Sequence, residues 1–138
     1  MSWIESHTVL LRHRKVLQMA CVLSLPPVVI LGHLHALWHA ILEPQEEGDL
    51  SSWPDDMIAH AAAHTGDSAA FVRALQGQKF LDGKLVHDWL DYAGRYLTHK
   101  YRTSNPKKLK AIYKLHRSVS RAVSSQTSIC PKSDNLPT

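Results

Sequence analysis

Histidine is unusually frequent in this chain of 138 residues: there are ten, and four of them form pairs spaced four residues apart. On a helix, His35 with His39 and His60 with His64 would each place two imidazoles on one face, a spacing that can hold a metal ion. A structural zinc site usually needs four ligands, often including cysteine, and Cys21 has no second cysteine at metal-binding spacing. The sequence therefore favours polar helix faces and partly buried imidazoles, with no metal and no cofactor.

Groups that could carry out catalysis have simpler structural roles. The pair Asp55-Asp56 is typical of the first turn of a helix, where carboxylates face the positive end of the helix dipole. Gly66 and Gly77 lie in turns and match no phosphate-binding loop. Asp88 and Asp91 flank a tryptophan and suit the start of a helix. The sequence therefore predicts that the protein is not an enzyme.

Positive charge is concentrated at the C-terminal end. Residues 1–94 hold 6 Lys and Arg against 11 Asp and Glu, whereas residues 95–138 hold 10 against 1, for net charges of −5 and +9. A basic arm on a mildly acidic body indicates a polyanionic partner, and phosphate contacts by Lys and Arg supply most non-specific affinity for nucleic acid. The alternative is a solvated basic face. The candidate phosphate-binding residues in this arm are Arg95, Lys100, Arg102, Lys107, Lys108, Lys110, Lys114, Arg117 and Arg121.

The first third of the chain predicts two helices, over about residues 6–23 and 27–42, separated by Pro26-Pro27. Residues 16–42 contain no Lys, Arg, Asp or Glu, which raises the possibility of a membrane span. The second helix has a polar stripe opposite an apolar one, which is typical of an amphipathic helix in a water-soluble protein. We therefore expect no membrane association. The polar stripe is Gly32, His35, His39 and Glu43, and the apolar stripe is Ile30, Leu34, Leu37 and Ile41.

The middle of the chain predicts a helix-turn-helix followed by a hairpin. A short strand is expected near residues 48–51, then a helix from a cap at Ser52 or Trp53 to about His64. A second helix, residues 68–78, follows the turn at residues 65–67. Residues 80–87 read as a β-hairpin around Asp-Gly. This order predicts a mainly α fold, a winged helix-turn-helix with a small β-hairpin wing and an extra basic C-terminal helix.

That C-terminal helix has apolar residues at alternating spacings of three and four, as on a helix face that packs against a partner. Self-association through Leu109, Ile112 and Val119, giving a homodimer, is therefore an open alternative. Residues 88–101 indicate a marginal helix before it. The expected organisation is a winged-helix domain over residues 1–97, a basic helical arm over 98–123 and a disordered tail over 124–138.

Several segments of residues 3–97 together resemble the N-terminal winged-helix domain of phage and prophage replication-initiation proteins, the replisome organisers. The resemblance implies a DNA-binding module that acts at a replication origin and recruits replication proteins. A longer C-terminal region usually contacts those partners, whereas 41 residues follow residue 97 here, so we expect a truncated or specialised form. The segments are Trp3-Ile4, His13–Leu23, Leu31–Ile41 (LGHLHALWHAI), Gly48–Ser51 (GDLS), Ala70–Asp82 (AFVRALQGQKFLD) and His87–Arg95 (HDWLDYAGR).

In a DNA-binding winged helix, the helix over residues 68–78 would meet the major groove of double-stranded DNA. Its outward side chains would be Arg73, Gln76 and Gln78, with Lys79 beyond its end, and Lys84 on the wing could reach a phosphate. A transcription regulator and a protein-interaction module on the same scaffold are the alternatives. The N-terminus lacks the layout of a signal peptide and the two cysteines are 109 residues apart, so we expect a cytoplasmic protein.

Overall fold

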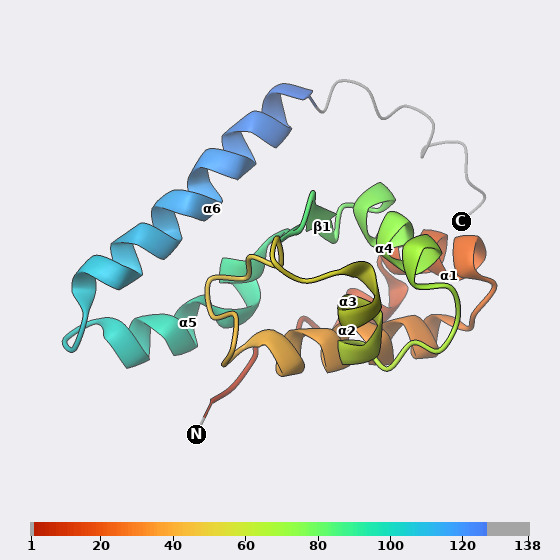
Figure 1. The fold of residues 1–138 in the computed structure, drawn as a ribbon, viewed down its shortest axis with the longest axis horizontal. Helices are drawn as coiled ribbons and strands as arrows, with labels where there is room; N and C mark the ends of the chain where they lie inside the picture. Colours follow the sequence, from red (N-terminus) through yellow and green to blue (C-terminus); the bar gives the residue numbers. More distant parts are fainter. Residues whose placement is uncertain (1, 127–138) are drawn as a thin grey trace.

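Prolines and short polar side chains divide the chain into one short 3-10 helix, six α-helices and one hairpin within the described residues. The computed structural model describes residues 2–126, with side chains described through residue 118. Its two strands form one antiparallel pair, so the fold is mainly helical with a small two-stranded sheet (Figure 1). The elements are η1 (Leu10–Arg12), α1 (Arg14–Leu23), α2 (Pro27–Ile41), α3 (Asp55–Ala61), α4 (Ser68–Gly77), β1 (Leu81–Asp82), β2 (Leu85–Val86), α5 (Trp89–Tyr101) and α6 (Pro106–Gln126).

The N-terminal helix is shorter than the sequence predicted. Residues before Leu10 are not helical, and His13 has an extended backbone (φ −67°, ψ 140°) that separates η1 from α1. The His13 imidazole Nδ1 accepts a hydrogen bond from the Lys15 backbone N–H at 3.1 Å and thereby caps α1. The predicted start at Ser6 is therefore wrong, because a side-chain cap at His13 competes with continued helix.

The cap predicted for α3 is also wrong. Pro54 occupies the N-cap position, and no side chain there bonds to the first turn. The helix then runs from Asp55 to Ala61, ending short of the expected His64. By contrast, the Asp67 carboxylate accepts from the Ala69 backbone N–H at 3.1 Å and thereby caps the start of α4.

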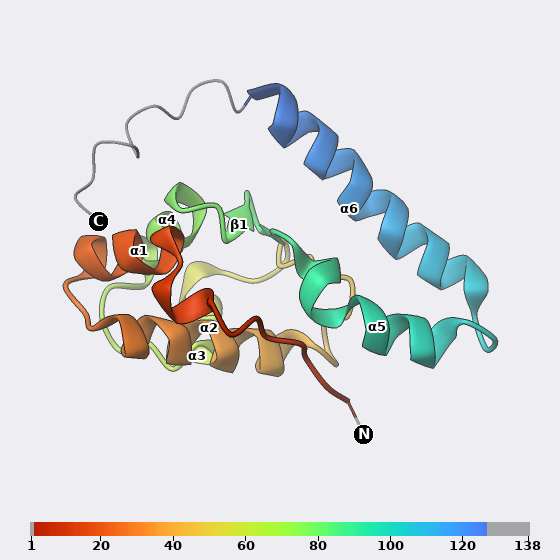
Figure 2. The same ribbon diagram turned by 180° about the vertical axis from the view of Figure 1, so that it is seen from behind.

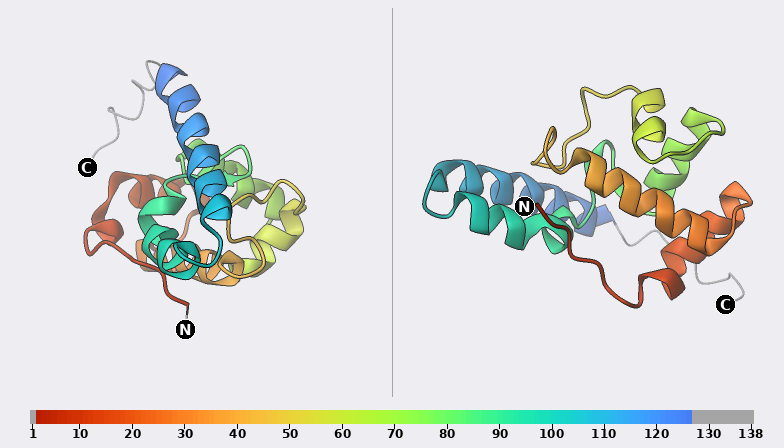
Figure 3. Two further views of the ribbon diagram at one scale, coloured as in Figure 1. Left: turned by 90° about the vertical axis from the view of Figure 1, so that its left-hand side faces the viewer. Right: turned by 90° about the horizontal axis from the view of Figure 1, so that it is seen from below.

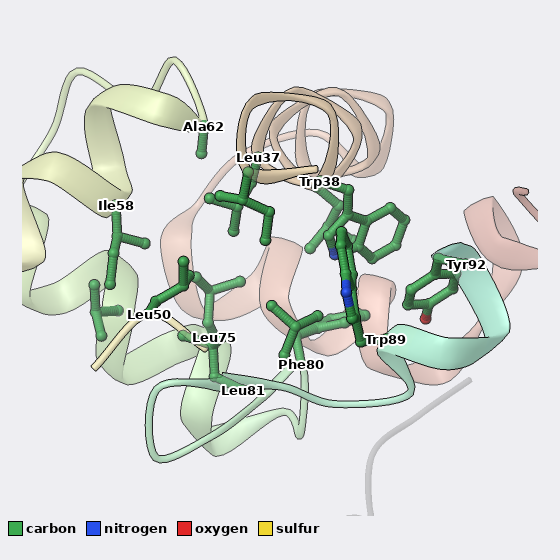
Figure 4. Packing of buried hydrophobic residues seen from close by; sticks show 14 of the residues in the cluster. Leu37, Trp38, Leu50, Ile58, Ala62, Leu75, Phe80, Leu81, Trp89 and Tyr92 are labelled. Carbon is green, nitrogen blue, oxygen red and sulfur yellow. The ribbon is translucent and has the colours of Figure 1, made fainter. Parts of the chain in front are cut away.

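The core lies where α1, α2, α3 and α4 meet the start of α5 (Figure 4). The four residues of the predicted apolar stripe of α2 are all buried, which confirms its amphipathic character. Trp38 from α2 stacks on Tyr92 from α5 with ring centroids 4.1 Å apart. Trp89 is fully buried and donates its indole N–H to the Glu46 carbonyl at 2.7 Å. These aromatic contacts join the helical body to α5.

The hairpin is short, and a third segment of the chain pairs with it. Leu81 pairs with Val86 and Asp82 with Leu85, leaving Gly83 and Lys84 as a two-residue turn. An isolated antiparallel bridge joins Asp49 to Leu85, so the segment expected to form a short strand does lie against the hairpin. The order of elements from α2 to β2 is compatible with a winged helix.

The last two helices form a helical hairpin beside the body (Figures 1 and 2). Helix α5 continues through residues 97 and 98, so the expected domain boundary falls inside a helix. Helix α6 runs through residue 126, whereas the rest of the tail expected to be disordered lies outside the described residues. Helix α5 leads away from the body, and α6 returns from the turn at its far end, so that the two helices diverge in Figure 1 and overlap in the view from below (Figure 3).

Across residues 2–126, no single helix has both the length and the apolar character needed to cross a membrane. Helices α1 and α2 pass that test only as a pair, with a bend of 104° between them.

Candidate nucleic-acid interface

Four exposed cations follow one side of α6. Lys107, Lys110, Lys114 and Arg117 are spaced three, four and three residues apart, which places them on one helix face over about 15 Å. Arg121 continues the same spacing, although its side chain lies beyond those that the structure describes. Helix α6 contains no Asp or Glu from residue 106 to residue 126. We call Lys107, Lys110, Lys114 and Arg117 the cation ridge.

The opposite side of α6 packs on the body, which fixes the outward direction of the ridge. Ile112 is 4% exposed and His116 is 7% exposed, and Leu109 is half-buried beside the core. The His116 imidazole Nε2 pairs with the Glu47 carbonyl oxygen at 2.5 Å. Burial lowers the pKa of His116 despite that hydrogen bond, so the imidazole is neutral at pH 7.

The burial of the inner side of α6 involves residues that the sequence predicted for dimerisation. Ile112 packs inside its own chain, so its apolar side chain is explained by the fold rather than by a second copy. Leu109 is half-buried, and the side chain of Val119 lies outside the described part.

Two of the predicted phosphate-binding lysines bind a carboxylate of the chain instead. Glu46 is 8% exposed, and its carboxylate accepts from Lys100 Nζ at 2.9 Å, from Lys108 Nζ at 2.5 Å and from the Tyr101 hydroxyl at 2.5 Å. Burial would raise the pKa of Glu46, but the hydrogen bonds from Lys108, Tyr101 and Lys100 outweigh it and lower the pKa to about 2. We call Glu46 with these three partners the Glu46 cluster; it fastens the ends of α5 and α6 to the loop after α2.

The helix predicted to enter the groove, α4, has two exposed cations near its outer surface. Arg73 and Lys79 are exposed and Gln78 is half-buried. The Gln76 side-chain amide instead donates to the Gly83 carbonyl at the hairpin turn, at 2.7 Å. Gln76 thus braces the hairpin against α4.

Lys84, the predicted wing contact, is likewise used within the fold. Its ammonium donates to the Trp53 carbonyl at 2.6 Å and lies 3.6 Å from the Asp55 carboxylate. These contacts tie the hairpin turn to the start of α3. A phosphate would have to compete with them for Lys84.

Lys15 is a cation near the end of α4 that the sequence did not identify as part of the interface. Its ammonium donates to the Lys79 carbonyl at 2.8 Å and lies 4.5 Å from the centre of the Phe80 ring. Burial lowers its pKa, although Asp88 and Asp82 act in the other direction. This contact spans 64 residues, so helical periodicity within α1 could not reveal it.

Arg95 on α5 and Arg102, directly after the end of α5, are both exposed. Arg95 Nε lies 3.6 Å from the Glu5 carboxylate, but its side chain remains 85% exposed, so this pair stabilises the fold little. The structure thus separates the predicted site into exposed cations on α5 and α6, a smaller set around the end of α4, and the structural residues Gln76, Lys84, Lys100 and Lys108.

The histidines that lie close together in the structure are not the pairs that are spaced four residues apart in the sequence. The rings of His35 and His39 are 6.4 Å apart. His33 and His64, which are 31 residues apart in sequence, approach instead, with 3.4 Å between Nε2 of His33 and Nδ1 of His64. In the part of the chain that the structure describes, no three His, Cys, Asp or Glu side chains are grouped to hold a metal.

No protein-family model, curated protein or solved structure matches the chain.

Proposed function

We propose that this protein binds double-stranded DNA through the cation ridge of α6, with a winged helix formed by α2 to β2 as its second contact. The cation ridge is the observation that carries the proposal. Its four described side chains are exposed, share one face and lie on a helix without a carboxylate. Duplex DNA presents one negative charge per about 1.7 Å of helix axis, so a row of cations over about 15 Å faces several phosphates.

In this arrangement α4 would read bases while α6 holds the backbone. Arg73 is the exposed α4 side chain best suited to a guanine, because a guanidinium can donate two hydrogen bonds to one base edge. Gln76 and Lys84 support this surface from within by bracing the hairpin. Together with the resemblance of residues 3–97 to replisome organisers, these features favour a role in replication initiation of the phage or prophage type.

The backbone contact is tested by fluorescence anisotropy with random-sequence duplex DNA over a series of salt concentrations. Lys114→Gln should weaken binding and make the slope of log affinity against log salt shallower by about 0.9, the value for one lost phosphate contact. Arg12→Gln is the matched control, because it removes one exposed cation from η1, away from α6. Equal effects of the two changes would show that net charge, not the ridge, determines binding.

Base reading is tested by selecting bound duplexes from a random library. The wild-type chain should enrich a sequence, and Arg73→Ala should relax the preference at one base pair, with a loss of about 1–3 kcal/mol for that site. If no sequence is enriched, α4 does not read bases and only the ridge contact remains. The replication role then requires that the enriched sequence support replication of an origin-less plasmid when the chain is supplied.

A further inference from the structure

The α5–α6 hairpin carries a groove on the face that does not contact the Glu46 cluster. Two adjoining hollows of about 760 and 380 Å³ make up this groove, and both are lined by Thr98 and Tyr113. The larger hollow lies toward α6 and the smaller one along α5. This face of the hairpin has no partner element within the described residues.

The floor of the groove is largely apolar, and its two hydroxyls share one hydrogen bond. Leu90, Gly94 and Thr98 recur every four residues on α5, and Leu109 and Tyr113 face them from α6. The hydroxyls of Thr98 and Tyr113 are 3.0 Å apart and bond to each other. One hydroxyl donates to the other in this bond, so an apolar side chain that covers the floor strands at most one O–H donor.

Both edges of the groove are positively charged. Arg95 on α5 and Arg102 just after its end line one edge, and Lys110, Lys114 and Arg117 on α6 line the other. Among the described residues that line the two hollows, none is Asp or Glu. An apolar floor between two cationic edges is complementary to a helix with an apolar stripe flanked by carboxylates.

We propose that this groove binds an acidic amphipathic helix of a partner protein. A second copy of the chain fits poorly, because self-pairing of the groove would bring five cations of each copy together. Single-stranded nucleic acid usually stacks its bases on a series of aromatic side chains, whereas the rings that line the two hollows, among the described residues, are those of Tyr113 and His99. The proposal does not depend on DNA binding, although Lys110, Lys114 and Arg117 would serve both ligands, so the helix and DNA should compete.

The probe is a fluorescein-labelled peptide of about 18 residues, roughly 27 Å as a helix, with Leu at positions i, i+3, i+4 and i+7 and Glu between them. A control peptide has the same composition but distributes its leucines around the helix. We expect the patterned peptide to bind the full-length protein about tenfold more tightly than the control. A (dT) oligonucleotide is measured in parallel.

Two variants fill the groove without changing its charge. Thr98→Trp obstructs it from α5, and Ser118→Trp obstructs it from the exposed surface of α6, where folding is least affected. Each should weaken patterned-peptide binding about tenfold and leave random-duplex affinity within about twofold. Lys107→Glu should weaken binding of random duplex DNA and leave patterned-peptide binding unchanged, because Lys107 belongs to the cation ridge but does not line the groove.

Equal binding of the two peptides would overturn the proposal, because charge alone would then explain the attraction. Unchanged peptide binding by folded Ser118→Trp protein would overturn it as well. Loss of (dT) binding in that variant, with no binding of the patterned peptide, would assign the groove to single-stranded nucleic acid instead. Failure of duplex binding with intact patterned-peptide binding would remove the proposed DNA function and leave the groove assignment standing.

Discussion

Three helix ends use a residue other than glycine in the left-handed conformation. Ser24, Ala63 and Lys79 have φ values of 55°, 58° and 64°. In each case the next residue's N–H bonds to a carbonyl five residues back, such as His64 to Ala59 at 2.9 Å. This is the geometry of a Schellman motif, in which glycine avoids the cost that a Cβ imposes.

Ala63→Gly should therefore stabilise the protein by about 1 kcal/mol. Ala111→Gly is the matched control: Ala111 is also exposed but lies inside α6, where glycine should destabilise by about 1 kcal/mol. Urea unfolding monitored by circular dichroism measures both changes. A decrease in stability for both variants would contradict the left-handed conformation at Ala63.

A second pair of substitutions separates a steric clash from backbone strain. Gly48 and Gly83 both have positive φ (74° and 64°), but a Cβ on Gly48 would lie 2.7 Å from two ring carbons of buried Trp89, whereas one on Gly83 would meet open space. Gly48→Ala should cost about 3 kcal/mol or more, and Gly83→Ala about 1 kcal/mol. Equal losses in urea unfolding would show that Trp89 does not pack against Gly48.

Residues of one type can have different roles that the sequence does not distinguish. Glu46 lies in an acidic run typical of a solvated loop, yet the structure buries it beneath three donors from 54 to 62 residues away. The residues around Lys100 and Lys108 do not distinguish these lysines from Lys110. The sequence therefore does not indicate which lysine contacts a carboxylate in the folded protein. The sequence could therefore predict where cations gather, but not which of them the fold uses.

At the scale of elements, Glu46 should make the attachment of the α5–α6 hairpin dependent on pH. Its folded pKa of about 2 lies below the ordinary value of 4.5, so its stabilising contribution is present above pH 4.5 and is lost as the pH falls toward 2. Glu46→Gln should cost about 2 kcal/mol at pH 7 and much less near pH 2. Urea unfolding of both proteins across that range measures the difference.

A gap between wild type and Glu46→Gln that stays constant from pH 7 to pH 2 would contradict the ion pairing. Glu43→Gln is a suitable control, because Glu43 is exposed in the same loop, where its carboxylate accepts from the Ser2 hydroxyl at 3.3 Å. We expect that change to have little effect on stability.

Elements with strong local signals were predicted well from the sequence. Helices α2 and α4 begin at Pro27 and Ser68, as predicted, and the apolar spacing of α2 identified its buried face. The alternating spacing in α6 predicted a packing face that includes Ile112, and this residue is buried. What covers that side was not predictable, because the covering loop after α2 is some 69 residues away in sequence. The groove on α5–α6 was missed for the same reason.

At the scale of the whole molecule, the basic arm is part of the folded structure. A chain that ends at Leu97 would cut α5 and remove all three donors of the Glu46 cluster, whereas one that ends at Ser104 keeps Lys100 and Tyr101. Both lack α6. The chain ending at Leu97 should therefore unfold at lower urea concentration than the chain ending at Ser104. Identical midpoints would show that the Glu46 cluster does not stabilise the body.

The Glu46 cluster also has a consequence for the order of synthesis. A ribosome makes the chain from its N-terminus, and domains generally begin to fold in that order. Glu46 is then without Lys100 until 54 more residues have been added and without Lys108 until 62 have been added. Until both lysines have been synthesised, the Glu46 carboxylate of the nascent chain lacks its full set of ion-pair partners. A chain that terminates before Lys100 would therefore leave this carboxylate without either lysine, whereas both lysines bind it in the full-length chain.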